Sequence, residues 1–367
     1  MSDKSEATTK LLAIRDRIDA IDDQILDLLS KRAECAEEVA ETKRAAGDQD
    51  LWFYRPEREA QILQRMSAEN KGLLANERIT AIYREIISSC LALEQIIKVA
   101  FLGPEGTFTQ EAANKHFGQS IETIPVASIG HVFREVENGL VDYGVVPIEN
   151  STEGVISYTL DMFMNSSLKI SGEIKLRIHQ NLLTDHKVDW KTVERVYSHQ
   201  QSLAQCREWL DENLPDAQRV PVASNTEAAV MASNDNNAAA IAGIKAADIY
   251  NLKIAQENIE DNINNTTRFL VIGKQDVPPS GVDKTTLMIS AKNRAGALYH
   301  LLTPLANNGL DMTRIESRPS RNANWEYYFF LDVNGHAEDE NVARALKELE
   351  REAELMRILG SYPKAIL

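Results

Sequence analysis

An unbroken run of helical periodicity over residues 10–46 is the feature that most constrains the fold. A helix of this length extends over about 55 Å at 1.5 Å per residue, which is more than one short helical bundle covers. We therefore expect a partner chain to pack along its apolar stripe, which includes Ile14 and Ile25. At about 100° per residue, Arg32 points within about 20° of Ile25, and Lys43 points within about 20° of Arg32. The stripe thus contains two cations, and each of them needs an anion.

More charged side chains fall on the apolar faces of the next two helical runs. These runs cover residues 56–71 and 76–97. Glu59 and Glu94 point into the apolar faces of their helices, and Arg58 lies at the edge of such a face. Arg15 lies in the same way at the edge of the first stripe. Four cations and two carboxylates are therefore expected in or beside one small helical core.

Two explanations fit these charges. For any one residue, the common explanation is a structural salt-bridge network that holds a coiled-coil dimer together. The alternative is a ligand site, because charges left unpaired in a core would cost several kcal/mol each. Cations outnumber carboxylates here, whereas a purely structural network would balance them. The surplus suits a ligand with two carboxylates, which arginine binds with two parallel hydrogen bonds.

Composition excludes several classes of function. The formal net charge of −15 argues against nucleic-acid binding, because phosphates would be repelled over most of the surface. The N-terminus is polar and no stretch of about 20 apolar residues occurs, so we expect a cytoplasmic protein without a membrane partner. Disulfides and structural zinc are not expected, because the cysteines are few and far apart: Cys35, Cys90 and Cys206.

The pattern changes at Val99 to short apolar strands that alternate with helices, such as VAFLG before TQEAANKHFG. This alternation predicts a mainly parallel α/β sheet with helices on both faces. The segment ends in a proline and glycine linker, DVPPSGVD. From Lys284 the order is strand, helix, strand, strand, helix, strand, which predicts an α+β, ferredoxin-like unit.

The first segment resembles the all-helical chorismate mutase family over residues 10–97, through its basic positions and the motifs RPEREAQIL and SSCLALEQ. The resemblance implies an intertwined helical dimer in which the partner's first helix supplies one arginine. By this resemblance, Arg15, Arg32 and Arg58 bind the two carboxylates of chorismate. Glu59 accepts its ring hydroxyl, and Lys43 and Glu94 contact its ether oxygen. Cys90, where some relatives have serine, is interpreted as a packing residue.

The reaction that this resemblance implies is a [3,3] rearrangement, which needs no nucleophile and no cofactor. The protein has to hold the chair-like conformer and stabilise negative charge on the ether oxygen. Glu94 donates a hydrogen bond only when it is protonated, and many relatives have glutamine there. We expect burial to raise the pKa of Glu94, so that mutase activity rises on acidification, and more so than in a Glu94→Gln variant.

The second segment contains four motifs, GPEGTF, PIENSTEG, YSHQQSLAQC and NNTTRF. Taken singly, hydroxyl and Asn residues before helices are usually caps. In this order, over residues 98–275, they resemble prephenate dehydratases, which have two α/β lobes around a cleft, like type II periplasmic binding proteins. The resemblance makes Thr267 the group that helps to protonate the departing ring hydroxyl, and Arg268 an anchor of the motif or of a carboxylate. The pocket residues that it implies are Glu149, Asn150, Ser151, Ser198 and Gln205.

His199 in the same segment invites assignment as a general acid. We favour a structural role, because the sequence SHQQ departs from the SHPQ that is common in relatives and a histidine in such a turn is more often structural.

The tail, residues 284–363, resembles the phenylalanine-binding ACT domains through the motifs NRAGALYHLL and IESRPS. The resemblance implies an effector site between two copies, built from Gly296, Ala297 and Leu298 and from Glu316, Ser317, Arg318 and Pro319. The alternative is that Gly296 only caps a helix and Pro319 only ends a strand. Tyr299 stands where some relatives have valine, which leaves the shape of the pocket open.

Together, the three resemblances indicate a bifunctional chorismate mutase/prephenate dehydratase with a C-terminal ACT domain. Such an enzyme, an isomerase and a lyase, converts chorismate to prephenate and then to phenylpyruvate without a cofactor, and phenylalanine inhibits it. We expect a homodimer or a tetramer. The competing class is a non-catalytic amino-acid-binding regulator. A helix that served only dimerisation would gain nothing from Arg32 and Lys43 on its seam, so the enzyme is favoured.

Overall fold

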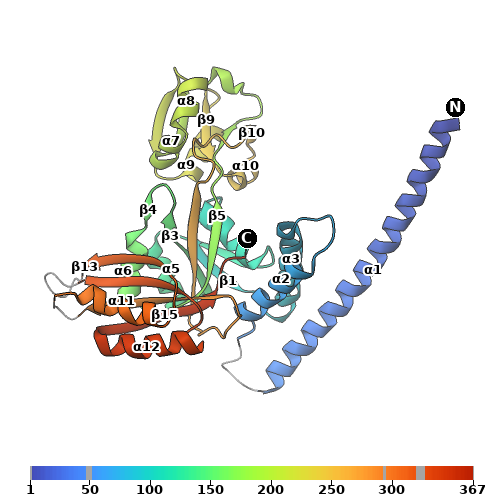
Figure 1. The fold of residues 1–367 in the computed structure, drawn as a ribbon. Helices are drawn as coiled ribbons and strands as arrows, with labels where there is room; N and C mark the ends of the chain where they lie inside the picture. Colours follow the sequence, from blue (N-terminus) through green and yellow to red (C-terminus); the bar gives the residue numbers. More distant parts are fainter. Residues whose placement is uncertain (1, 47–51, 292–294, 320–326, 367) are drawn as a thin grey trace.

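The computed structural model describes residues 2–46, 52–291, 295–319 and 327–366 (Figure 1). It contains a helical N-terminal part, a two-lobed α/β part and a C-terminal α+β part, which confirms the multidomain fold class. No helix in the described part combines the length and the apolar composition that a membrane span needs.

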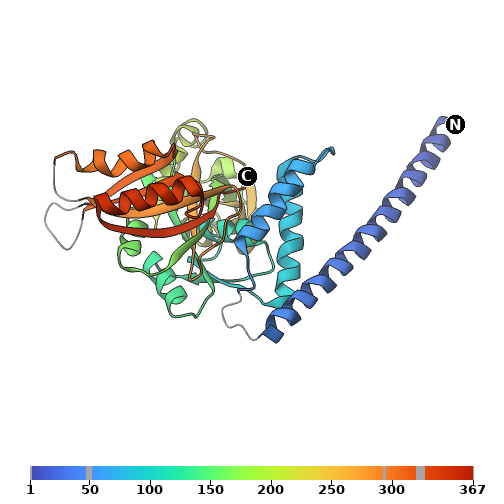
Figure 2. The same ribbon diagram turned by 60° about the horizontal axis from the view of Figure 1, so that its bottom comes forward.

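Three helices form the N-terminal part: α1 (Ser2–Ala46), α2 (Pro56–Glu69) and α3 (Asn76–Glu94). α1 begins earlier than expected, because the residues before position 10 include neither Gly nor Pro to interrupt it. Figures 1 and 2 both show that the N-terminal part of α1 extends away from the rest of the molecule. The apolar side chains of this part of α1 are exposed to solvent, with Leu26 66% and Leu28 63% exposed.

The first α/β lobe is built on a mixed sheet. Its strand order is β2 (Glu122–Val126), β1 (Lys98–Leu102), β3 (Tyr143–Asn150), β11 (Thr266–Gly273) and β5 (Lys169–Arg177), and β4 (Gly154–Val155) pairs with β3. Its helices are α4 (Phe108–Phe117), α5 (Ile129–Glu137) and α6 (Ser157–Asn165). β1 runs parallel to β2 and β3, whereas β11 runs antiparallel to β3 and β5.

The second lobe has its own mixed sheet. Its strand order is β10 (Lys253–Gln256), β6 (Asn181–Thr184), β9 (Ala238–Ala242), β7 (Arg195–His199) and β8 (Gln218–Val222). Its helices are the short η1 (Trp190–Thr192), α7 (Gln200–Gln205), α8 (Arg207–Asn213), α9 (Asn225–Ser233) and α10 (Ile244–Tyr250). The expectation of a mainly parallel sheet is therefore wrong. The chain leaves the first lobe along β5 and returns along β11, and these two strands pair in opposite directions.

The C-terminal part confirms the expected ferredoxin-like order. It consists of β12 (Asp283–Ala291), α11 (Ala297–Asn307), β13 (Met312–Pro319), β14 (Tyr327–Asn334), α12 (Glu340–Glu352) and β15 (Ala353–Pro363). The antiparallel sheet has the order β13-β14-β12-β15, and α11 packs beside α12. Three residues of the expected effector motifs, Asn293, Arg294 and Ser320, lie outside the described residues.

The C-terminal sheet shares a hydrophobic core with the first α/β lobe. Ile170 of β5 belongs to the same buried cluster as Met288, Phe330 and Leu359 of the C-terminal sheet. β15 lies against β5, and a Cβ atom placed on Gly360 would lie 2.2 Å from the carbonyl oxygen of Ile170. Only glycine allows the two backbones to approach this closely.

We predict that Gly360→Ala destabilises the protein by about 1–3 kcal/mol, because the added methyl group meets rigid backbone and forces β15 away from β5. Calorimetric measurement of thermal unfolding tests this. Gly72→Ala is the matched control, since a Cβ atom at Gly72 meets nothing closer than 3.4 Å. An unchanged unfolding temperature for Gly360→Ala would contradict the described packing.

Candidate active sites

The first candidate site is a cavity of about 780 Å³ between α1, α2 and α3. It brings together five of the six side chains that the mutase resemblance selects: Arg32, Lys43, Arg58, Glu59 and Glu94. Sequence reasoning missed four other residues that line this cavity. They are Arg55, just before α2, Glu57 on α2, and Pro278 and Pro279 in the linker. The linker prolines lie about 200 residues further along the chain, so no local pattern could have found them.

Two carboxylates of this cavity already have cationic partners. Lys43 Nζ lies 3.6 Å from Glu94 Oε2, and Arg55 Nε lies 2.6 Å from Glu57 Oε1. Burial raises the pKa of Glu94, although Lys43 and Arg44 act in the opposite direction. Glu94 therefore takes up a proton more readily than an exposed glutamate.

Glu59 is the third carboxylate, and its side chain is only 10% exposed. Burial raises the pKa of Glu59 to about 7, although its ion pair with Arg84 of α3 lowers it. Glu59 Oε1 lies 3.4 Å from Arg84 Nε.

Arg32 and Arg58 differ from these pairs, because among the described residues neither of them forms an ion pair. Arg32 donates a long hydrogen bond of 3.4 Å to the carbonyl oxygen of Ile86, and Arg58 is exposed on the cavity wall. Two guanidinium groups in one cavity are thus available for carboxylates of a ligand.

Arg15, the sixth selected residue, does not line the cavity of its own chain. It is exposed on α1, 17 residues before Arg32, which corresponds to about 26 Å along the helix.

The second candidate site is a cavity of about 520 Å³ between the two α/β lobes. Three of the predicted dehydratase residues line it: Asn150, Gln205 and Thr267. Asn150 Nδ2 donates to Thr267 Oγ1 at 2.8 Å, so the hydroxyl hydrogen of Thr267 remains available for another acceptor. His199 also lines the cavity, and its Nδ1 accepts from the backbone N–H of Gln201 and so caps α7.

A chain of side-chain hydrogen bonds crosses between the lobes at this cavity. Asn150 Nδ2 donates to Asn265 Oδ1 at 3.0 Å, and Asn265 Nδ2 donates to Gln205 Oε1 at 3.0 Å. Gln180 donates to Gln205 Oε1 and to Ser202 Oγ, at 3.2 and 3.0 Å. Sequence reasoning missed Gln180 and Ser202 as cavity residues: Gln180 stands outside the four motifs, and Ser202 lies within YSHQQSLAQC but was not singled out.

Three predicted pocket residues lie outside this cavity. Ser198 lies on β7, an inner strand between β9 and β8, and is fully buried there; its hydroxyl donates to the carbonyl oxygen of Ile241 on β9. Ser151 Oγ accepts from the backbone N–H of Thr266. The Glu149 carboxylate lies 3.5 Å from Arg314 Nε of β13. These side chains support the cleft rather than line it.

The prediction that Arg268 binds substrate needs correction. Successive side chains on a strand point to opposite faces, so Arg268 lies on the other side of β11 from Thr267. Its side chain is 11% exposed, and its guanidinium pairs with Glu173 of β5 at 2.8 Å and with Asp332 of β14 at 2.5 Å. Lys284 of β12 shares Glu173 at 2.8 Å. Arg268 therefore anchors the C-terminal domain to the first lobe.

The predicted effector residues lie at one end of α11 and on the edge strand β13. Gly296 has a φ of 74° and is the N-cap of α11, which begins at Ala297, and Leu298 is 38% exposed. Arg318 Nε and Nη2 donate to the two carboxylate oxygens of Asp161 on α6, at 3.0 and 3.2 Å. Glu316, Ser317 and Pro319 share β13 with it. The described residues include no group of three or more His, Cys, Asp or Glu side chains that could hold a metal ion.

Three family models match the chain in sequence order. They are chorismate mutase type II over residues 14–95, prephenate dehydratase over residues 99–277 and the ACT domain over residues 285–351.

Solved structures resemble a large part of this chain. A prephenate dehydratase from Arthrobacter aurescens in complex with L-Phe is 35% identical, with a TM-score of 0.69, and the match covers 73% of this chain and 90% of that one. GqqA, described as a novel type of quorum quenching acylase, is 30% identical with a TM-score of 0.68, covering 73% and 98%.

Relatives of full length carry the name bifunctional chorismate mutase/prephenate dehydratase. The one from Stutzerimonas stutzeri is 52% identical over 98% of this chain and 99% of its own length. The one from Neisseria gonorrhoeae is 47% identical over 97% and 98%, and the one from Escherichia coli K12 is 34% identical over 96% of both. With all three parts matched in order, the chain belongs to the family of bifunctional chorismate mutase/prephenate dehydratases with a C-terminal ACT domain.

Proposed function

We propose that this chain rearranges chorismate to prephenate in the helical cavity and converts prephenate to phenylpyruvate, water and carbon dioxide in the cleft between the lobes. The corresponding domains are residues 10–97, 98–275 and 284–363, the last being regulatory. The observation that carries the proposal is the helical cavity, in which Arg32 and Arg58 have no carboxylate partner among the described residues.

The mutase site acts by holding and polarising its substrate. Arg32 and Arg58 bind the carboxylates of chorismate, and Glu59 accepts its ring hydroxyl. Lys43 and protonated Glu94 donate to the ether oxygen, where negative charge grows as the carbon–oxygen bond breaks. Fixing the chair-like conformer in this way supplies the rate enhancement without a covalent step.

A second copy of the chain completes the mutase site. The apolar side chains along the N-terminal part of α1 are exposed, Leu26 and Leu28 among them. Arg15 is about 26 Å from the cavity of its own chain, and it reaches the cavity of a second copy if two α1 helices pack against each other. Such packing buries the bare stripe, so we propose a dimer in which each chain gives its Arg15 to the other.

The dehydratase site needs one well-placed hydroxyl. Thr267 donates its hydrogen to the ring hydroxyl of prephenate, and Asn150 fixes the orientation of Thr267 by donating to its oxygen. The bond between the ring and its carboxylate breaks and releases carbon dioxide, and its electron pair makes the ring aromatic. The ring hydroxyl leaves as water with the proton that Thr267 donates, and solvent returns a proton to Thr267. A threonine is a weak acid, but aromatisation and loss of carbon dioxide drive the step, so orientation is the main task of the protein.

Phenylalanine is the proposed feedback inhibitor, bound near Gly296 and Leu298 and along β13. A relative with 35% identity was solved in complex with L-Phe. β13 also sends two arginines into the dehydratase lobe, Arg314 toward Glu149 and Arg318 to Asp161. A movement of β13 would therefore reach the strand that carries Asn150.

We predict that Thr267→Ala lowers phenylpyruvate formation by about 10²–10⁴-fold, because the leaving oxygen loses its proton donor. Prephenate formation from chorismate should stay normal in the same protein. Both products are followed in one assay that starts from chorismate. Thr266→Ala is the matched control, since its hydroxyl donates to the carbonyl oxygen of Asn264. Normal dehydration by Thr267→Ala would refute the assignment.

We predict that the ratio of mutase kcat/KM between the wild type and Glu94→Gln rises as the pH falls from neutral to mildly acid. Burial raises the pKa of Glu94, so acidification creates the protonated donor that glutamine supplies at every pH. Glu41→Gln, which removes an exposed carboxylate of α1, serves as the control. A ratio that does not change with pH would contradict this role of Glu94.

If inhibition acts through substrate affinity, prephenate and phenylalanine must weaken each other's binding by the same factor. We predict that saturating prephenate weakens phenylalanine binding by about fivefold or more. Equilibrium dialysis with labelled phenylalanine measures this, and the use of Thr267→Ala prevents consumption of prephenate. Equal affinities in the presence and absence of prephenate would exclude this form of inhibition.

A further inference from the structure

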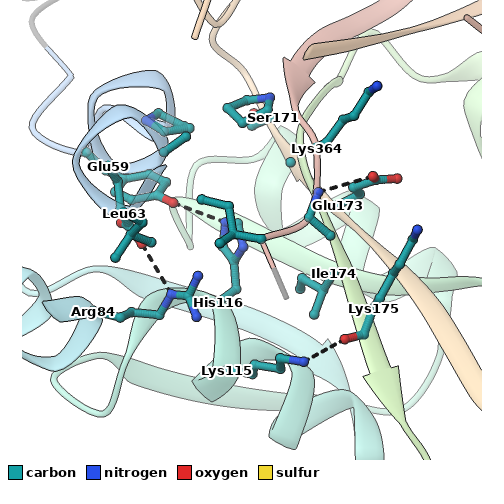
Figure 3. A pocket seen from close by; sticks show the side chains of 17 residues that line it. Glu59, Leu63, Arg84, Lys115, His116, Ser171, Glu173, Ile174, Lys175 and Lys364 are labelled. Atoms are coloured by element: carbon teal, nitrogen blue, oxygen red, sulfur yellow. Dashed lines mark hydrogen bonds and ion pairs between the residues drawn. The ribbon is translucent and has the colours of Figure 1, made fainter. Parts of the chain in front are cut away.

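A third and smaller cavity, of about 40 Å³, lies where all three domains meet (Figure 3). The cavity is lined by α2 and α3 of the mutase domain, by α4 and β5 of the dehydratase domain, and by residues 363–366, which are the last residue of β15 and the three that follow it. Glu59 lines both this junction cavity and the mutase cavity. The Glu59 carboxylate therefore stands in the wall between the proposed mutase site and the domain junction.

Arg84 approaches Glu59 from the junction side. Its Nε lies 3.4 Å from Glu59 Oε1, and the two side chains are only 13% and 10% exposed. Figure 3 shows this contact as a dashed line beside His116 and Leu63. Arg84 lines the junction cavity but not the mutase cavity, so it touches the carboxylate without reaching the ligand space.

Other charged groups line this cavity, but none of them is paired with Glu59. The amino groups of Lys175 and Lys364 point away from Glu59 in Figure 3. Lys115 Nζ donates to the carbonyl oxygen of Lys175 at 2.8 Å, and Glu173 is shared by two cations. Burial lowers the pKa of His116 to about 3, so His116 is neutral and hydrogen-bonded to the Tyr54 hydroxyl at 3.0 Å.

The mutase side gives Glu59 no counter-ion either. The charged residues there are two ion pairs and two arginines without a carboxylate: Lys43 with Glu94, Arg55 with Glu57, and Arg32 and Arg58. Within the described residues, Arg84 is thus the cation that is paired with Glu59.

A buried carboxylate without a counter-ion takes up a proton. Burial already raises the pKa of Glu59 to about 7, with Arg84 holding it down. Protonated Glu59 would carry its own O–H and lose the acceptor-only character of a carboxylate. A site that needs Glu59 to accept the ring hydroxyl therefore needs it ionised.

We propose that Arg84 is a positioning residue of the mutase site, which keeps Glu59 ionised and fixes one of its oxygens so that the other can accept the ring hydroxyl of chorismate. This inference rests on the proposed function, in which Glu59 contacts that hydroxyl. Arg84 acts through Glu59 alone. The contact also places the mutase machinery directly against the dehydratase helix α4 and the end of the ACT sheet.

The test is the pH dependence of mutase kcat/KM in a Glu94→Gln background, where the opposing effect of Glu94 is absent. We expect activity to rise with pH around a midpoint near 7, as Glu59 ionises in the free enzyme. Adding Arg84→Gln should move the midpoint up by about one unit or more. About a tenth of Glu59 would then be ionised at about pH 7 in place of about half, so kcat/KM falls about fivefold there. The activity at high pH should recover.

Arg84→Lys keeps a cation at the site, so its midpoint pH should lie close to that of the Glu94→Gln parent. Lys115→Met is the matched control, because it removes another cation of the same cavity that does not contact Glu59, and its midpoint should stay in place. Dehydratase activity with prephenate reports whether each variant is folded. If Arg84→Gln does not fold, Arg84→Met and Arg84→Lys carry the comparison.

An unchanged midpoint in a folded Arg84→Gln or Arg84→Met variant would overturn the proposal, as would a loss of activity that high pH does not restore. Failure of the proposed function gives a different result. In that case the wild type would not consume chorismate at any pH, or Glu59→Gln would retain full mutase activity.

Discussion

The cost of burying charge determines how this chain is assembled and where it can bind a ligand. In the Arg268 cluster, two cations meet two carboxylates: Arg268 and Lys284 pair with Glu173 and Asp332. Burial raises the pKa of Glu173, but its two cations outweigh burial and hold it below its usual range. The charges of this cluster neutralise one another, so it needs no ligand.

The charges of the helical cavity are not neutralised in this way. Within the part of the chain that is described, its carboxylates are all paired with cations, whereas Arg32 and Arg58 have no carboxylate partner. A dicarboxylate removes this imbalance, and that is the physical basis of the mutase assignment.

The three domains are in direct contact, and segments outside each domain contribute to its site. Pro278 and Pro279, in the linker before the ACT sheet, line the mutase cavity, and Gln61 of α2 donates to the carbonyl oxygen of Pro279 at 3.4 Å. The backbone N–H of Ala365, after the last strand, donates to Glu173 of the dehydratase lobe at 3.1 Å. A change in the ACT domain therefore has short physical routes to both candidate sites.

Sequence reasoning succeeded where the direction of a side chain follows from the geometry of its own helix. The angular position of Arg32 and Lys43 follows from 100° per residue, so their place in the helical cavity was predictable. It failed where tertiary contacts decide. Thr267 and Arg268 are adjacent in sequence but face opposite sides of β11, and only the packing of the ACT sheet shows which side is the cleft. Arg84 was missed because its partner Glu59 is 25 residues away on another helix. The direction of β11 against β5 likewise leaves no trace in the apolar pattern.

The most direct test of the central claim is a crystal structure of the full chain with a bicyclic dicarboxylate that imitates the chair-like transition state of the mutase reaction. The account predicts that this compound fills the helical cavity, with its carboxylates within hydrogen-bond distance of Arg32, Arg58 and Arg15 from a second copy of α1. Density for the compound at another place, with Arg32 still bonded to the carbonyl oxygen of Ile86, would contradict it.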